Sequence, residues 1–172
     1  MLTIRRYQKS DRPQVGVLIA DTYSEFNLSE VTSEQRDAML GPFLYARSPE
    51  AVHQKNIAEA LRAPMVLVAE INGQIVGVLR GGRVDEVGRT VLQSLFVSGK
   101  HHRHGIGRKL VERFEKEYIA RGVTVFKLLA TLHAVPFYLE MGYRKSTGIR
   151  SIHSFAGAGL PSQPMKKVVK RK

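Results

Sequence analysis

The sequence predicts a single domain of mixed class, α/β or α+β, in which helices cover the faces of a mixed β-sheet. Its 172 residues are enough for one domain with a sizeable core. Short β-rich runs alternate with amphipathic runs of helical period along the chain. Asn72-Gly73 joins two β-rich runs, which is the strongest short signal for a hairpin. We expect residues 1–172 to form one domain, with a basic C-terminal tail from about residue 166.

Helices are predicted where a start signal precedes apolar residues at helical spacing. Pro13 lies in the first turn of one such run and Pro49 in the first turn of another. The clearest helix, residues 105–121, has its apolar side chains on one face and ends at Gly122. Residues 24–44 are polar and mixed, and the pattern assigns them no element. The predicted helices begin at Ser10 and at Ser48, the latter running to about Arg62, and cover residues 105–121 and 133–141.

Strands are predicted in the β-branched and aromatic runs between these helices. Gly81-Gly82 indicates a bulge or a strand end. The last two strands are expected to be joined by a loop at residues 157–161. With the helices, the strands give the order β-α-α-β-β-β-α-β-α-β-β. The predicted strands cover residues 2–6, 65–71, 75–83, 90–97, 123–130, 143–154 and 162–169.

The basic charge is concentrated in the second half of the chain. Lys and Arg number 27 against 15 Asp and Glu, which gives a net charge of +12 and a pI of about 10.2. Residues 1–86 carry 10 basic and 11 acidic side chains, whereas residues 87–172 carry 17 and 4. So basic a half favours an anionic partner: a nucleic acid, an acidic membrane surface or a phosphate-bearing ligand.

Several classes of protein are excluded by what the sequence lacks. With no cysteine there are no disulfides, no thiolate zinc sites and no cysteine nucleophile. No run of about 18 apolar residues and no signal-peptide pattern occurs, so we expect a cytoplasmic protein with no membrane partner. His101, His102 and His104 cluster, but their spacing fits no helical pair, and we predict no metal site.

The most informative stretch runs from a strand end through a basic loop into a helix. The strand ends at Leu95-Phe96-Val97, and the helix opens at Gly105-Ile106-Gly107. The first turn of a helix leaves unpaired N–H groups, which together with the helix dipole form an anion site. Glycines let the backbone approach a phosphate closely, although small residues for helix packing would give the same pattern. The positive side chains around this turn are Lys100, Arg103, Arg108 and Lys109.

A second stretch, residues 134–143, places aromatic side chains on a short helix. Taken alone, Phe137, Tyr138 and Tyr143 indicate core packing. Taken together, the two stretches resemble the GNAT superfamily of N-acetyltransferases, and the element order fits from Leu2 to about Val169.

Two motifs carry the resemblance. The Gln/Arg-x-x-Gly-x-Gly/Ala loop of the family is matched at Gly105 and Gly107, with His102 in the Gln/Arg position. The later pattern Ala-x-x-x-Tyr-x-x-x-Gly-Tyr/Phe is matched by Ala134, Tyr138, Gly142 and Tyr143.

The resemblance implies a GNAT-like central mixed, mostly antiparallel sheet of about seven strands with about four helices on its faces. It implies acetyl-CoA as the acetyl donor, lying where the fourth and fifth strands part. The basic side chains around the loop are expected to account for part of the positive charge. The cofactor-binding residues that it implies are Leu95, Phe96, Val97, His102, Arg103, His104, Gly105, Ile106, Gly107 and Arg108.

The resemblance also implies transfer of the acetyl group to a primary amine by direct attack in a ternary complex, with Tyr138 as the general acid. Some members place a glutamate base on the fourth strand, where this chain has Val91. The base therefore stays open, and a water relay is an equal alternative to a carboxylate. The carboxylates in suitable places along the chain are Glu25, Glu70, Asp85 and Glu86.

The acceptor is expected to be a small-molecule or peptide amine. An acidic segment at residues 21–44 would attract such an amine, although simple solvated loop charge explains it equally well. A homodimer through the late strands is compatible with the resemblance. Two other functions stay open: a basic nucleic-acid-associated module, which is not favoured, and a family member that binds acyl-CoA without turnover.

Overall fold

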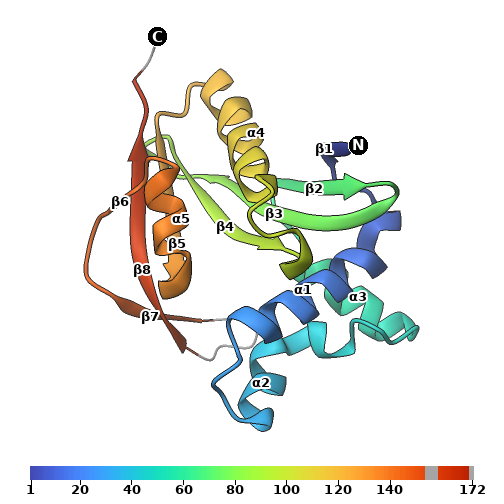
Figure 1. The fold of residues 1–172 in the computed structure, drawn as a ribbon. Coiled ribbons are helices and arrows are strands. Elements are labelled where there is room, and N and C mark those ends of the chain that lie inside the picture. Colours follow the sequence, from blue (N-terminus) through green and yellow to red (C-terminus); the bar gives the residue numbers. More distant parts are fainter. Residues whose placement is uncertain (154–158, 171–172) are drawn as a thin grey trace.

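The computed structural model describes residues 1–153 and 159–170, which form one open eight-stranded sheet with helices on both faces (Figure 1). The α-helices are α1 (Arg12–Phe26), α2 (Ser33–Leu40), α3 (Ala51–Ala60), α4 (Ile106–Ala120) and α5 (Val135–Glu140). The strands are β1 (Leu2–Arg6), β2 (Met65–Ile71), β3 (Gln74–Val84), β4 (Arg89–Val97), β5 (Val125–Thr131), β6 (Arg144–Lys145), β7 (Arg150–His153) and β8 (Gly159–Val168).

The strands are ordered β1-β2-β3-β4-β5-β8-β6, and β7 pairs with β8. The β4–β5 pair is parallel, and the remaining pairs within the described residues are antiparallel. This confirms the predicted mixed, mostly antiparallel sheet. The β2–β3 hairpin turns at Asn72 and Gly73, whose φ angles of 50° and 81° suit the twist of the flanking strands. The register shifts at Gly81 also confirm the expected bulge.

The helix α2 lies in the segment to which the sequence assigned no element. Its start is a capping box. The Thr32 hydroxyl accepts a hydrogen bond from the backbone N–H of Gln35, and the Gln35 side-chain oxygen accepts one from the backbone N–H of Thr32. Its last residues, Met39 and Leu40, are buried. With so few apolar positions the helical period is weak, so the capping residues are the signal that could have revealed it.

The predicted strand at residues 143–154 is wrong as one element, because β6 and β7 are separate. Both pair with β8, in which Pro161 and Pro164 have no N–H to donate. At the interruption the Gln163 side chain donates to the carbonyl of Thr147 (2.6 Å). Ser154 and residues 157–158 of the expected loop lie outside the described residues, and β8 already begins at Gly159.

The sheet separates two hydrophobic cores. Helices α1, α2 and α3 lie together on one face (Figure 1), and α4 packs on the other. Successive residues of β2 alternate between the cores: Leu67 packs on the α4 side and Val68 on the α1 side. No helix of the described residues combines the length and apolar character that crossing a bilayer requires.

The basic tail expected from about residue 166 overlaps the sheet, since β8 runs to Val168. Lys167 donates to the carboxylate of Glu115 on α4 (2.6 Å), and the Tyr143 hydroxyl donates to the same carboxylate (2.8 Å). Glu115 is buried, and both partners lie close around it. This network joins α4 to β8, so part of the C-terminal charge has a structural role.

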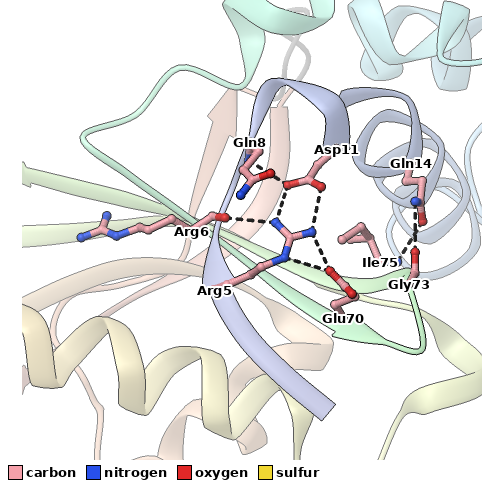
Figure 2. A network of polar contacts seen from close by, with 8 residues as sticks. All are labelled: Arg5, Arg6, Gln8, Asp11, Gln14, Glu70, Gly73 and Ile75. Atoms are coloured by element: carbon pink, nitrogen blue, oxygen red, sulfur yellow. Dashed lines mark hydrogen bonds and ion pairs between the residues drawn. The ribbon is translucent and has the colours of Figure 1, made fainter. Parts of the chain in front are cut away.

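A second polar network holds the first strand to the first helix (Figure 2). The Arg5 guanidinium donates to both oxygens of Asp11 (2.8 and 2.9 Å) and to Glu70 on β2 (2.8 and 2.6 Å). The Gln8 amide donates to Asp11 as well (2.7 Å). The Asp11 side chain is 7% exposed, and the hydrogen bonds from Arg5 hold the pKa of its carboxyl below the ordinary value.

We predict that Asp11→Asn lowers the free energy of unfolding by about 2 kcal/mol at pH 7, because it removes the charge from buried, charge-assisted hydrogen bonds. The folded pKa is depressed, so this stabilisation is present above about pH 4, the unfolded value, and is lost as the pH falls through the folded value. Urea unfolding of wild type and variant at several pH values checks this.

The matched control is Asp21→Asn, which removes an exposed ion pair with Arg47. It should change the free energy of unfolding by less than about 1 kcal/mol. A difference between wild type and Asp11→Asn that stayed constant below pH 4 would contradict the assigned role of the Asp11 charge.

Candidate active site

The strands β4 and β5 part after three paired residues. Arg89, Thr90 and Val91 pair with residues 125–127, and beyond them no pairing joins the two strands within the described residues. β4 then continues along β3 to Val97, and β5 continues along β8 to Thr131. The gap is a cleft with a cavity volume of about 270 Å³, lined by residues 92–96 of β4 and 128–131 of β5.

Backbone groups of β4 face this gap at alternate residues. The Ser98 amide donates to the carbonyl of Val76 on β3 (2.9 Å), and Phe96 lies opposite Val78. Antiparallel pairs alternate in their hydrogen bonding, so the Phe96 amide points to β3 whereas the amides of Leu95 and Val97 point toward the gap. Phe96 instead offers its ring to the cleft, edge-on to Tyr23 at 5.9 Å between centroids.

The loop between β4 and α4 brings a set of backbone amides beside the gap. Arg103 and Gly105 have left-handed φ angles of 63° and 74°, and glycine adopts this conformation without strain. The Lys109 amide donates to the carbonyl of Gly105 (3.0 Å) and is the first to bond within the helix. The amides of residues 106–108 precede it and have no acceptor within the helix, which suits them to bind an anion.

Gly107 also serves close packing. A Cβ atom there would lie 3.3 Å from the ring of Phe137 and 3.7 Å from the side chain of Leu95. The start of α4 therefore fits tightly against α5 and β4. The Gly-x-Gly spacing left two interpretations open, an anion-binding turn and small residues for helix packing. The positive φ at Gly105 is compatible with the first, and the close packing at Gly107 with the second.

His102, which stands in the Gln/Arg position of the loop motif, ties the loop to the strand end. Its Nε2 lies 2.8 Å from the carbonyl oxygen of Val97, and its ring packs on Phe26 of α1 at 4.5 Å between centroids. A carbonyl only accepts, so Nε2 carries the hydrogen of this bond. The His104 Nδ1 lies 2.8 Å from the His102 carbonyl and closes the loop on itself.

Tyr138 lies on α5 and lines the cleft across from β4. Its ring packs edge-on against Phe137 (5.0 Å) and Tyr143 (5.7 Å), and the residue is 6% exposed. Among the described residues, none forms a hydrogen bond with its hydroxyl. Burial raises the pKa of this hydroxyl well above its ordinary value, so it holds its proton at neutral pH.

Residues 27–169 match the family described as acetyltransferase (GNAT) domain. The chain belongs to the GNAT family. No curated protein sequence matches this GNAT domain.

The GNAT domain is similar in fold to solved N-acetyltransferase structures. PaiA N-acetyltransferase from Thermoplasma acidophilum, in complex with coenzyme A, has a TM-score of 0.74 at 14% identity, over 98% of this chain and 99% of that chain. Ribosomal-protein-S18-alanine N-acetyltransferase from Escherichia coli has 0.67 at 19%, over 99% and 95%. An aminoglycoside 6′-N-acetyltransferase complexed with coenzyme A has 0.65 at 17%, over 99% and 98%.

This GNAT domain is an acyltransferase, and acetyl-CoA as the expected acetyl donor fits the family. The residues present fit that donor. The amides at the start of α4 suit a pyrophosphate, and the free edge of β4 at Leu95 and Val97 suits an extended amide-bearing arm.

Residues that the sequence reasoning missed also line the cleft of the GNAT domain. They come from elements that only the fold brings together: Tyr23 and Asn27 from the end of α1, Arg80 from β3, and His133 from the 3₁₀ turn η4 (Leu132–Ala134). In the sequence, the one indication of these lining residues was Arg80, a basic residue inside the apolar run of β3. Burial, and then the neighbouring His102, lower the pKa of His133 below its ordinary value.

The carboxylates considered as bases lie elsewhere. Glu70 binds Arg5, Asp85 binds Arg89, and neither these two nor Glu25 and Glu86 line the cleft. The acidic segment expected to attract the acceptor is partly neutralised, since Asp21 pairs with Arg47 (2.8 Å). Of the described residues that line the cleft, His133 is the one that can accept a proton at neutral pH.

Proposed function

We propose that the chain is an N-acetyltransferase that transfers the acetyl group of acetyl-CoA to a primary amine by direct attack in a ternary complex. The observation that carries this proposal is the parting of β4 from β5 beside the unbonded amides of α4. The free edge of β4 can pair with an extended amide-bearing arm, and the amides at the start of α4 can bind phosphates. Direct transfer follows from the absence of cysteine, because no acetyl-cysteine can form.

The donor-binding residues are assigned by backbone and charge. Leu95 and Val97 present strand amides, Phe96 presents its ring, and residues 103–108 present the loop and helix amides. His102 is assigned a positioning role, since its Nε2–H holds the Val97 carbonyl. Bound acetyl-CoA supplies a thioester carbonyl to the cleft, and the Leu95 amide, which points toward the gap from a residue that lines the cleft, is the donor placed to stabilise negative charge on its oxygen.

Tyr138, expected from the resemblance to be the general acid, is assigned here as the hydrogen-bond donor to the leaving sulfur. Its hydroxyl lines the cleft and keeps its proton. A thiol has an ordinary pKa near 8.5, far below that of this buried hydroxyl, so complete proton transfer to a thiolate is unfavourable. Tyr138 therefore acts by donating a hydrogen bond to sulfur as charge develops there.

His133 is assigned as the group that takes the proton of the attacking amine. Its imidazole lines the same cleft as Tyr138, and burial, with the neighbouring His102, lowers its pKa below the ordinary value. The lowered pKa keeps the ring neutral at neutral pH and ready to accept a proton.

Binding of the donor can be measured by thermal unfolding. Acetyl-CoA at 100 times its Kd should add about 2.7 kcal/mol to the free energy of unfolding, because it binds only the folded state. For a domain of this size the melting temperature should rise by roughly 5–10 °C. Acetylation of an amine panel, followed by release of free thiol, measures turnover.

RNA matched in phosphate charge is the control. Stabilisation by RNA but not by acetyl-CoA would overturn the proposal in favour of a nucleic-acid-associated module. Stabilisation by acetyl-CoA without acetylation of any amine would point to a family member that binds without turnover.

Tyr138→Phe should lower kcat by ~100-fold at unchanged KM for acetyl-CoA, because it removes only the donated hydrogen bond. The melting temperature should stay the same, since the hydroxyl bonds to no described residue. Tyr118→Phe, on α4 outside the cleft, is the matched buried control and should keep wild-type kcat. Full kcat in Tyr138→Phe would remove Tyr138 from the chemistry.

The pH profile tests His133. Catalysis needs its neutral form, so kcat at saturating acceptor should fall as the pH drops through its pKa, with a midpoint below 6.5, the ordinary histidine value. His133→Asn should lower kcat and abolish that acid limb. His53→Asn, on α3 and stacked on Tyr45, should preserve both. An acid limb that survives in His133→Asn would assign the proton to another group.

A further inference from the structure

The cleft has two chemically different sides. On the α4–α5 side its lining includes Leu92, Leu128 and Tyr138, which belong to the core beneath α4. On the α1–α3 side its lining includes Tyr23, Asn27 and Arg80. The loop amides suited to the donor lie at the start of α4, so the donor reaches the cleft from the first side. The acceptor amine then approaches from the second side, where Arg80 lies.

Arg80 is held in a fixed position there. Its Nε donates to the Ser94 hydroxyl on β4 (3.1 Å), and its Nη1 donates to the carbonyl of Ala60, the last residue of α3. The side chain is half-buried, and burial lowers the pKa of the guanidinium, which stays charged at neutral pH because arginine is too basic to lose its proton there. A guanidinium has five N–H donors in a rigid planar fork, which matches a carboxylate.

The described residues that line the cleft carry charge of one sign. Of the sixteen described residues that line it, none is Asp or Glu, and Arg80 is the one that carries a full charge at neutral pH. The half-buried setting strengthens its electrostatic field relative to water. A polycationic acceptor would bring positive charge to this cation, whereas an anionic group on the acceptor would be attracted.

We propose that the acceptor is a small amine that also carries a carboxylate, and that Arg80 receives this carboxylate on the α1–α3 side of the cleft. The inference rests on the proposed function. The cavity of about 270 Å³ is small and must also admit the reacting end of the donor, which favours a small acceptor. Asn27 and Ser94 line the same side and supply further polar contacts.

Pairs of acceptors with and without a carboxylate test whether the acceptor's negative charge is recognised. A panel of α- and ω-amino acids is assayed against the corresponding amides, which keep the size and lose the charge, and against diamines. We expect kcat/KM to be at least ~10-fold higher for the carboxylates, the effect of one charge-assisted contact. Equal or better turnover of the amides or diamines would overturn the inference. Dipeptides form a third arm, and a preference for them over free amino acids would overturn the assignment of a small acceptor.

Variants then test the residue. Arg80→Gln should raise the KM for the carboxylate acceptor by at least ~10-fold and leave kcat/KM for its amide within about 2-fold. Arg80→Lys keeps the charge and should recover part of the preference. Arg83→Gln, on the exposed part of the same strand and outside the cleft, should behave as wild type. An unchanged carboxylate preference in Arg80→Gln would remove Arg80 from recognition.

The acetyl-CoA-induced rise in melting temperature is measured in every variant. A normal rise in Arg80→Gln shows that the fold and the donor site are intact, so that a changed KM reports the acceptor. Absence of the rise in the wild type contradicts the proposed function itself. Acetylation of amines without any preference for carboxylates contradicts only the inference about the acceptor.

Discussion

The parting of β4 and β5 is the constraint on which the site depends. Three residue pairs hold the two strands together, and each strand then stays with its other neighbour. Two register shifts around Gly81 increase the local twist where β4 leaves β5. Side chains of α5 and of both strands line the opening. The interruption of sheet pairing thus becomes a cleft with backbone donors along one edge.

The two faces of the sheet contribute different residues to that cleft. One core packs beneath α4 and α5 and fixes the helix start, the loop and Tyr138. The other packs beneath α1 and α3 and carries Tyr23 and Arg80 to the opposite side. Alternation along β3 is what sends the neighbouring residues Leu79 and Arg80 to different faces of the sheet and therefore to different roles.

Local signals in the sequence predicted most of the fold. The hairpin at Asn72-Gly73 and the helix ended by Gly122 depend on residues close together in the chain, and both were predicted at nearly the right positions. The split between β6 and β7 falls opposite Pro164 of β8, a strand that pairs across the sheet, and α2 has too few apolar residues for a clear period. The loop motif at Gly105 was readable for the same local reason, whereas Arg80 and His133 face the cleft only because the sheet brings β3 and η4 together.

The contact between Arg80 and the carbonyl of Ala60 has a consequence for how the protein can change. The last carbonyls of a helix have no partner within it, and this guanidinium caps α3 by donating to the carbonyl of its last residue, Ala60. The residue assigned to read the acceptor thus also closes a helix. A lineage that replaced Arg80 to accept a different amine would lose that cap, so selection for a new acceptor and selection for a stable α3 would act on the same position.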